Sequence, residues 1–243
     1  MSQTLATARR VMSQLRHDPR TIALVLVVPC VLMTTLRFVY DHHLRVFDQA
    51  GTPLLAVFPL ATMFVVSSVA VLRERRNGTL ERLLTTPISR LALLGGYAIA
   101  FALLATVQAI SVCALALGPL DLHVAGPTAM VLVLCVAIAI LGMGLGLLAS
   151  AFAQTEFQVV QFFPAAIYPQ MLLAGLLVAR QRMPGVLHAI SDAMPLSYAV
   201  DAMHHLSHQH GVAPALWGDL AIVVGFAVAS VALGAVTLRR QTA

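Results

Sequence analysis

Six apolar stretches, each of about the length that crosses a lipid bilayer, constrain the fold of this chain more than any other feature of its sequence. They cover residues 21–40, 54–72, 91–117, 128–152, 157–178 and 216–238. A transmembrane helix needs about 20 consecutive apolar residues. Apolar residues make up 59% of the chain and charged residues only 10%, which excludes a soluble globular protein. The sequence therefore predicts an all-α polytopic membrane protein, a single transmembrane domain over residues 1–243 with six spans.

Two further segments predict helices that do not cross the bilayer. Residues 1–20 carry apolar side chains at helical spacing and arginines on another face, which predicts an amphipathic interfacial helix on the inner membrane surface. Residues 180–215 are only half apolar, and Pro184 and Pro195 divide them into two short helical patterns. Neither pattern is long enough to span, so this segment is predicted to form an outer re-entrant helical hairpin before the last span.

The distribution of arginine predicts the orientation of the chain. With the N-terminus inside, eleven of the fifteen arginines fall on the inner side, and they are Arg9, Arg10, Arg16, Arg20, Arg73, Arg75, Arg76, Arg82, Arg90, Arg239 and Arg240. Four fall outside, and they are Arg37, Arg45, Arg180 and Arg182. Because positive residues accumulate on the cytoplasmic side of membrane proteins, both termini are predicted to be cytoplasmic.

The loop between the second and third stretches, residues 73–90, concentrates charge. It reads RERRNGTLERLLTTPISR and holds five of the fifteen arginines. Its interior combines a turn with an N-cap, an acid in the first helical turn, a face of leucines and a proline that ends the helix. This pattern predicts a short helix on which a partner docks, made of Gly78, Thr79, Leu80, Glu81, Arg82, Leu83 and Leu84. A solvated loop whose arginines merely set the topology would explain the charge but not the capped amphipathic helix.

Polar residues within the predicted spans are uncharged. Ser67, Gln108 and Gln158 are examples, and either hydrogen bonds between helices or a substrate path accounts for them. No Asp, Glu, Lys or Arg falls at the middle of a span, which argues against a carrier coupled to protons or sodium. Gly142 and Gly146 have the GxxxG spacing of close helix contact, and packing within one protomer is the favoured interpretation.

The sequence offers no motif for ATP binding or catalysis. The chain has no lysine, so the phosphate-binding loop GxxxxGK[ST] is impossible, and HExxH and GxSxG are absent. His204, His205, His208 and His210 cluster on the predicted outer side, where only Asp201 could join them as a ligand. Zinc sites need a more complete ligand set, so neither a metal site nor a catalytic residue is predicted.

Two long motifs carry a family resemblance. The first is RERRNGTLERLLTTPISRLALLGGY over Arg73–Tyr97, and the second covers Phe157–Met203, with a PLSY segment at Pro195–Tyr198. In this order they resemble the loop after the second span, and the fifth span with its outer hairpin, of ABC-2 type permeases from the drug- and antibiotic-export branch. The chain departs from that family at Ala179, where proline is frequent, and at His204, where arginine is frequent.

The resemblance implies a permease subunit of an ATP-driven exporter in the plasma (inner) membrane of a bacterium. Two permeases, either two copies or this chain with a sister, would pair with two ATPase subunits that bind ATP and Mg²⁺. This chain would bind no cofactor and would be non-catalytic, and the docking helix in its charged loop would be the coupling helix seated on the ATPase. The cargo would be an amphipathic drug, antibiotic or lipid, and no nucleic acid is expected.

Two groups of candidate residues complete the prediction. The substrate path would lie at a dimer interface of the first, second and fifth spans, with Phe64, Ser67, Phe162, Phe163, Tyr168 and Gln170. Arg73, Glu74 and Arg75 would anchor the charged loop at the membrane surface. Two other functions stay open: an ATP-independent channel or secondary carrier, which would transport alone, and a non-transporting assembly or sensor subunit, which would bind partners without moving a substrate.

Overall fold

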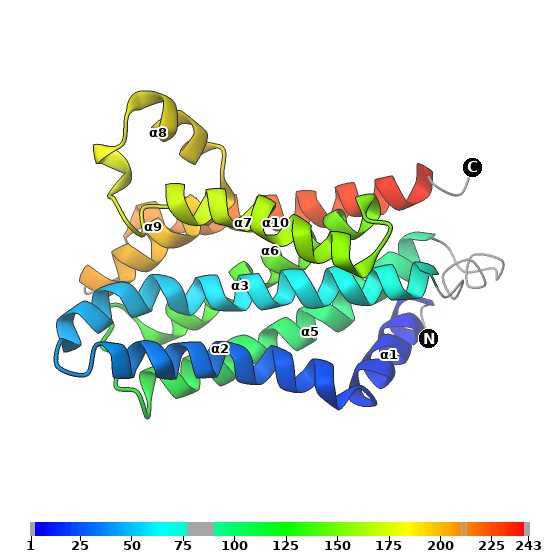
Figure 1. The fold of residues 1–243 in the computed structure, drawn as a ribbon, viewed down its shortest axis with the longest axis horizontal. Helices are drawn as coiled ribbons and strands as arrows, with labels where there is room; N and C mark the ends of the chain where they lie inside the picture. The colour runs from blue at the N-terminus through cyan, green and yellow to red at the C-terminus, as the bar shows by residue number, and fades with distance from the viewer. Residues whose placement is uncertain (1–2, 77–89, 210, 212, 241–243) are drawn as a thin grey trace.

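The computed structural model describes residues 3–76, 90–209, 211 and 213–240, and every element in these ranges is a helix (Figure 1). The long helices are α2 (Pro19–Val39), α3 (Leu44–Arg76), α5 (Arg90–Leu117), α6 (Thr128–Phe152), α7 (Glu156–Leu173) and α10 (Pro214–Arg240). The shorter ones are α1 (Gln3–Arg16), the 3₁₀ turn η1 (Arg180–Arg182), α8 (Gly185–Asp192) and α9 (Pro195–His208). The predicted all-α fold is confirmed for the described residues.

Five of the described helices are long and apolar enough to cross a membrane. They correspond to the predicted spans except the fifth, where α7 has 18 residues, Glu156–Leu173, against the expected 157–178. The helix ends early because Gly175 adopts a positive φ of 93°, a conformation that closes many helices. The six-span count is thus not confirmed, and a crossing by α7 stays a prediction. The hydropathy of α7 is lowered by four polar side chains, which are Glu156, Gln158, Gln161 and Gln170.

The second predicted span is longer in the structure than the sequence indicated. α3 begins at Leu44 instead of at residue 54, and it continues through Pro53 and Pro59 to Arg76. A proline inside a long membrane helix is tolerated where neighbouring helices cover the freed backbone carbonyls, and both prolines are buried here. The polar residues ahead of Pro53 conceal the start of this helix in the sequence.

The helices α3 and α6 are the most buried of the five span-length helices and approach each other closely where α6 carries glycine. A Cβ built on Gly142 would lie 2.8 Å from Leu60 Cα, and one on Gly146 would lie 3.1 Å from the Phe64 carbonyl carbon. The contact therefore leaves no room for a side chain at either position. The predicted use of this GxxxG pair for packing within one protomer is confirmed.

The helix ends gather into two groups (Figure 1). The helix α1, the C-terminal end of α3, the start of α5 and the end of α10 lie together, and we call this the Arg-rich end. The turn between α2 and α3 lies at the opposite end with α8 and α9. The cytoplasmic position of the Arg-rich end stays a prediction. Its arginines in α1, α2 and α3 are Arg9, Arg10, Arg16, Arg20, Arg73, Arg75 and Arg76.

The amphipathic N-terminal segment forms α1 and ends before Pro19. Its buried face, which includes Thr7, Val11 and Leu15, packs against α5. The approach is close, since a Cβ built on Gly96 in α5 would lie 2.5 Å from Thr7 Cβ. The apolar face predicted for the membrane surface therefore packs on the bundle itself, and the interfacial location of α1 stays a prediction.

The segment predicted as an outer hairpin contains the two short helices α8 and α9, which are separated at Ala193 and Met194. Helix α9 packs against α3, α6 and α10 and buries Leu196, Val200 and Met203. Figure 1 shows α8 projecting from the bundle, whereas α9 lies against it. The insertion of this segment into the outer leaflet stays a prediction.

Candidate functional site

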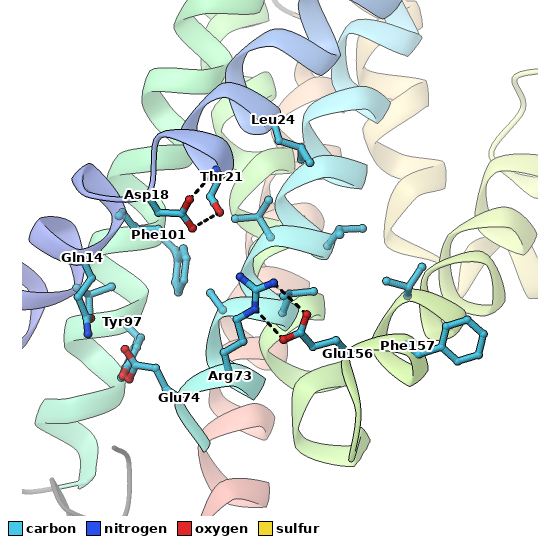
Figure 2. Close-up of a pocket in the computed structure, with 17 residues that line it drawn as sticks. Gln14, Asp18, Thr21, Leu24, Arg73, Glu74, Tyr97, Phe101, Glu156 and Phe157 are labelled. Carbon is cyan, nitrogen blue, oxygen red and sulfur yellow. Dashed lines mark hydrogen bonds and ion pairs between the residues drawn. The ribbon is translucent and has the colours of Figure 1, made fainter. Parts of the chain in front are cut away.

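A pocket at the Arg-rich end, between α1, α2, α3, α5 and α7, is the candidate functional site (Figure 2). Its volume of about 590 Å³ lies within the range of small-molecule sites. Apolar side chains from these helices form its walls, including Val11, Leu24, Val69, Phe101 and Val160. We call it the Asp18 pocket, and its polar lining consists of Gln14, Asp18, Thr21, Arg73, Glu74 and Glu156.

Arg73 joins α3 to α7 across the Asp18 pocket. Its Nε donates to Glu156 Oε1 at 2.8 Å and its Nη2 donates to Glu156 Oε2 at 3.0 Å, a fork that matches the carboxylate. Thr155 caps α7 by accepting a hydrogen bond from the backbone N–H of Gln158, which places Glu156 in the first turn. The hydrogen bonds from Arg73 hold the pKa of Glu156 below its usual range, so this carboxylate is ionised at neutral pH.

A second ion pair joins α1, α3 and α5. Arg10 Nη2 lies 3.4 Å from Glu74 Oε2 and donates to the Tyr97 hydroxyl at 2.9 Å. The guanidinium also lies 5.9 Å from the centre of the Tyr97 ring, which attracts a cation through its face. Tyr97 is buried and stacks on Phe101, so this wall of the pocket is held from three helices.

Asp18 closes the pocket at the start of α2. Its carboxylate caps the helix by accepting hydrogen bonds from the backbone N–H of Thr21 at 3.2 Å and from the Thr21 hydroxyl at 2.6 Å. The hydroxyl hydrogen bond is the main reason that the pKa of Asp18 is lowered, so its charge is present at neutral pH. Figure 2 shows Arg73 between Asp18 and Glu156 in the lining.

The three residues predicted to anchor the charged loop lie together at the end of α3. Arg73 contacts α7 and Glu74 contacts α1, while Arg75 donates a hydrogen bond to the Ser150 carbonyl in α6. All three therefore connect α3 to neighbouring helices. Their role as anchors at a membrane surface stays a prediction.

The predicted coupling residues lie outside the described residues. The structure describes α3 up to Arg76 and α5 from Arg90, so the ends that carry the loop sit beside the Asp18 pocket. The predicted docking helix stays a prediction, and its residues are Gly78, Thr79, Leu80, Glu81, Arg82, Leu83 and Leu84.

Three of the six predicted path residues meet between α3 and α7. The ring centroids of Phe64 and Phe163 lie 5.9 Å apart, as do those of Phe163 and Tyr168. Phe64 is fully buried, whereas Tyr168 is 54% exposed. The three rings therefore form a continuous aromatic seam from the core to the surface of α7.

The other three path residues serve different contacts. Ser67 donates to the Met143 carbonyl at 3.1 Å and so links α3 to α6. Gln170 donates to the Ala166 carbonyl within its own helix, at 2.8 Å. Phe162 packs on a small apolar cluster at the start of α7. None of the six residues lines the Asp18 pocket, and their role as a substrate path stays a prediction.

Three residues that complete the pocket, Asp18, Glu156 and Tyr97, are not among the site residues predicted from the sequence. For Asp18 a local signal existed, because Asp followed by Pro ahead of an apolar run is typical of an N-cap with proline in the first helical turn. For Glu156 the signal was Thr155, a second N-cap, placed directly before an acid. Nothing local marks Tyr97, which becomes part of the pocket only through helix packing.

A separate polar cluster lies at the opposite end of the bundle. Arg180 is buried and forms ion pairs with Asp192 in α8 and Asp201 in α9. A cavity of about 440 Å³ adjoins it, where burial lowers the pKa of His204. Within the described part of the chain, no three His, Cys, Asp or Glu side chains are placed to hold a metal ion, and His210 falls outside that part.

Comparisons with known proteins give matches over most of the chain. A family model described as ABC-2 type transporter matches residues 2–206. The probable multidrug ABC transporter permease YbhR of Escherichia coli (strain K12) is 26% identical over 167 residues, as is the protein of the same name from Escherichia coli O157:H7. The matched segment covers 69% of this chain and 45% of each relative, so it spans less than half the length of those proteins.

Proposed function

Because this chain belongs to the ABC-2 type transporter family, we propose that it is the permease subunit of an ABC exporter that moves an amphipathic drug, antibiotic or lipid across a bacterial plasma membrane. Five span-length helices in the described residues agree with a membrane subunit. The relative's name, which includes multidrug, supports the class of cargo.

The observation that carries this proposal is the lining of the Asp18 pocket. Apolar walls and ionised carboxylates face the same cavity of about 590 Å³. A wholly polar solute would leave the apolar walls without apolar contact, and a wholly apolar solute would desolvate the carboxylates without compensation. A molecule with one polar and one apolar part satisfies both, which supports an amphipathic cargo.

The energy source in this proposal is a separate ATPase subunit that binds ATP and Mg²⁺. Since the chain has no lysine, it cannot supply the phosphate-binding lysine of a P-loop. The coupling helix proposed within residues 77–89 connects the ends of α3 and α5, and both helices line the Asp18 pocket. Closure of the ATPase would shift the permease only if the coupling helix contacts it differently in two states.

A second permease, either a copy of this chain or a sister, would cover the exposed apolar side of α2 and α7. Only 17% of the residues in the 18-residue apolar stretch of α2 are buried, and Val31 in α2 and Val160 in α7 are about half exposed. The aromatic seam of Phe64, Phe163 and Tyr168 reaches the same side through α7. This arrangement supports a substrate path at the interface of the two permeases.

The test is transport by proteoliposomes that contain the permease and its ATPase. The double variant with Glu81→Arg and Leu83→Asp reverses the charge and removes the apolar face of the coupling helix, so transport and stimulated ATP hydrolysis should fall at least tenfold. The matched control carries Asp41→Arg and Leu44→Asp, an acid-to-arginine and a leucine-to-aspartate change at exposed positions of the opposite end, where Asp41 pairs with Arg37. It should keep more than half of the wild-type rate.

Two results would overturn the proposal. Nucleotide-independent transport by the permease alone would make it a channel or a secondary carrier. Partner binding without any nucleotide-dependent movement of amphipathic probes would make it an assembly or sensor subunit.

A further inference from the structure

We propose that the Asp18 pocket selects cationic amphiphiles, with Asp18 as the charge partner of a positively charged amine and the apolar walls as the site of the attached hydrocarbon. This inference deepens the proposed function, on which it rests, because it names the charge of the cargo.

The charges that line the pocket do not cancel. Three carboxylates face one guanidinium, that of Arg73, and both of its hydrogen bonds in the pocket go to Glu156. Glu74 has its own cation in Arg10. Arg10 lies outside the lining, and Arg76, also outside it, acts on Glu156 as well, so the excess of carboxylates holds for the lining groups alone. Asp18 forms no ion pair within the described residues, although the charge of Arg73 contributes to lowering its pKa.

Helix capping holds the Asp18 carboxylate in place without occupying all of its hydrogen-bond acceptor positions. An ionised carboxylate offers about four acceptor positions; Thr21 occupies two of them, and the backbone N–H of Arg20 also acts on the carboxylate. Within the described residues no ion pair joins Asp18 to the side chain of Arg16 or Arg20; Arg16 lines a different cavity with His17, and the Arg20 side chain is exposed. Helix capping therefore orients the carboxylate in the lining, and its remaining acceptor positions are available to an amine.

The walls suit the rest of such a molecule. Phe157 supplies exposed aromatic surface, which attracts cations as well as hydrocarbon, whereas Tyr97 and Phe101, also in the lining, are almost fully buried. Val65, Val69 and other aliphatic side chains of α3 extend the apolar surface along that helix away from the charged end. An amphiphile can thus keep its amine beside Asp18 at the Arg-rich end and lay its hydrocarbon against α3.

An anionic amphiphile meets the opposite situation. Its headgroup would need a free cation, but Arg73 is engaged with Glu156 and Arg10 with Glu74. Breaking either pair would add a second carboxylate without an ion pair to a lining that already contains Asp18. The pocket therefore discriminates by the sign of the headgroup rather than by the hydrocarbon.

The experiment measures binding to the full chain in phosphatidylcholine nanodiscs, without ATPase. The probes are a dansyl-labelled alkyl trimethylammonium cation and the alkyl sulfonate with the same chain and fluorophore, each corrected with empty nanodiscs. Wild type should bind the cation at least tenfold more tightly than the sulfonate. Asp18→Asn should weaken cation binding about fivefold and leave sulfonate binding unchanged or stronger.

Three variants make the result specific. Asn caps a helix about as well as Asp, so Asp18→Asn keeps the start of α2 while removing the charge. Asp121→Asn removes the same charge from an exposed turn at the opposite end, at a positive φ of 55° that asparagine tolerates, and should change neither affinity. Ala70→Phe fills the pocket and should weaken cation binding at least tenfold.

The outcomes separate this inference from the proposed function. Equal binding of the two probes, or unchanged cation binding in Asp18→Asn or in Ala70→Phe, overturns the inference even if ATP-driven transport of other amphiphiles is measured. Selective cation binding that Asp18→Asn weakens, together with failure of any nucleotide-driven transport, supports the inference and overturns the exporter.

Discussion

At the scale of single residues, the charges around the Asp18 pocket act mainly as links between helices. Arg73 connects α3 to α7 through two hydrogen bonds, and Arg10 connects α1 to α3 and α5. The Arg73–Glu156 pair is about half exposed on both sides. An exposed pair contributes about 0.5 kcal/mol, so its main effect is to position the start of α7 rather than to stabilise the fold.

The ion pair predicts a pH-dependent stability difference. The pKa of Glu156 is lower in the folded protein, so the pair stabilises the fold above the unfolded pKa of about 4.3 and is lost as the pH falls through the folded pKa. Glu156→Gln should therefore lower Tm by roughly 1–2 °C at pH 7, and by less as the pH approaches 3. Thermal unfolding in detergent checks this. A difference that stays constant down to pH 3 contradicts the assignment.

At the scale of elements, the α3–α6 contact decides how the bundle packs. Gly142 faces the backbone of Leu60, and Gly146 faces Phe64 and Ser67. Ser67 adds a hydrogen bond to the Met143 carbonyl across the same contact. The glycines of α6 lie directly against the backbone of α3. The two helices therefore cannot move apart to admit a methyl group without losing contacts along their length.

A single methyl group should be enough to disturb this contact. Gly142→Ala is expected to destabilise the protein by about 2 kcal/mol through overpacking and to lower Tm by about 5 °C. The control is Gly225→Ala in α10, where nothing lies within 4 Å of the added Cβ. That change should leave Tm the same or raise it, since alanine favours helix. Equal losses in the two variants would refute the close contact.

Features that depend on neighbouring residues in the chain could be predicted from the sequence. Five of the six spans predicted from apolar length are span-length helices in the described residues, and the spacing of Gly142 and Gly146 predicted their use in packing. The pocket was not predictable in the same way. Glu74 pairs with Arg10, 64 residues away along the chain, and Glu156 pairs with Arg73, 83 residues away. The periodicity of a sequence does not indicate contacts between residues so far apart. The start of α3 was missed because polar residues and Pro53 precede the apolar stretch that marks the rest of the helix.

At the scale of the whole molecule, α7 determines the number of crossings. Its first residue, Glu156, pairs with Arg73 at the Arg-rich end, and the carbonyl of its last residue, Leu173, accepts a hydrogen bond from Ser191 in α8 at the opposite end. Figure 1 shows α7 running between the two ends of the bundle. Its 18 residues span about 27 Å, close to the thickness of a hydrocarbon core. These positions support a sixth crossing despite the polar side chains.

Cysteine labelling tests that crossing in cells. With Cys30, Cys113 and Cys135 replaced, single cysteines are placed at Gln154, before α7, and at Val186, in α8, both of which are exposed. If α7 crosses and the Arg-rich end is cytoplasmic, an impermeant maleimide labels Val186→Cys in intact cells and Gln154→Cys only after permeabilisation. Labelling of both from one side would mean that α7 turns back within the membrane. Labelling of Gln154→Cys alone would reverse the orientation and place the charged loop, with its proposed ATPase contact, outside the cell.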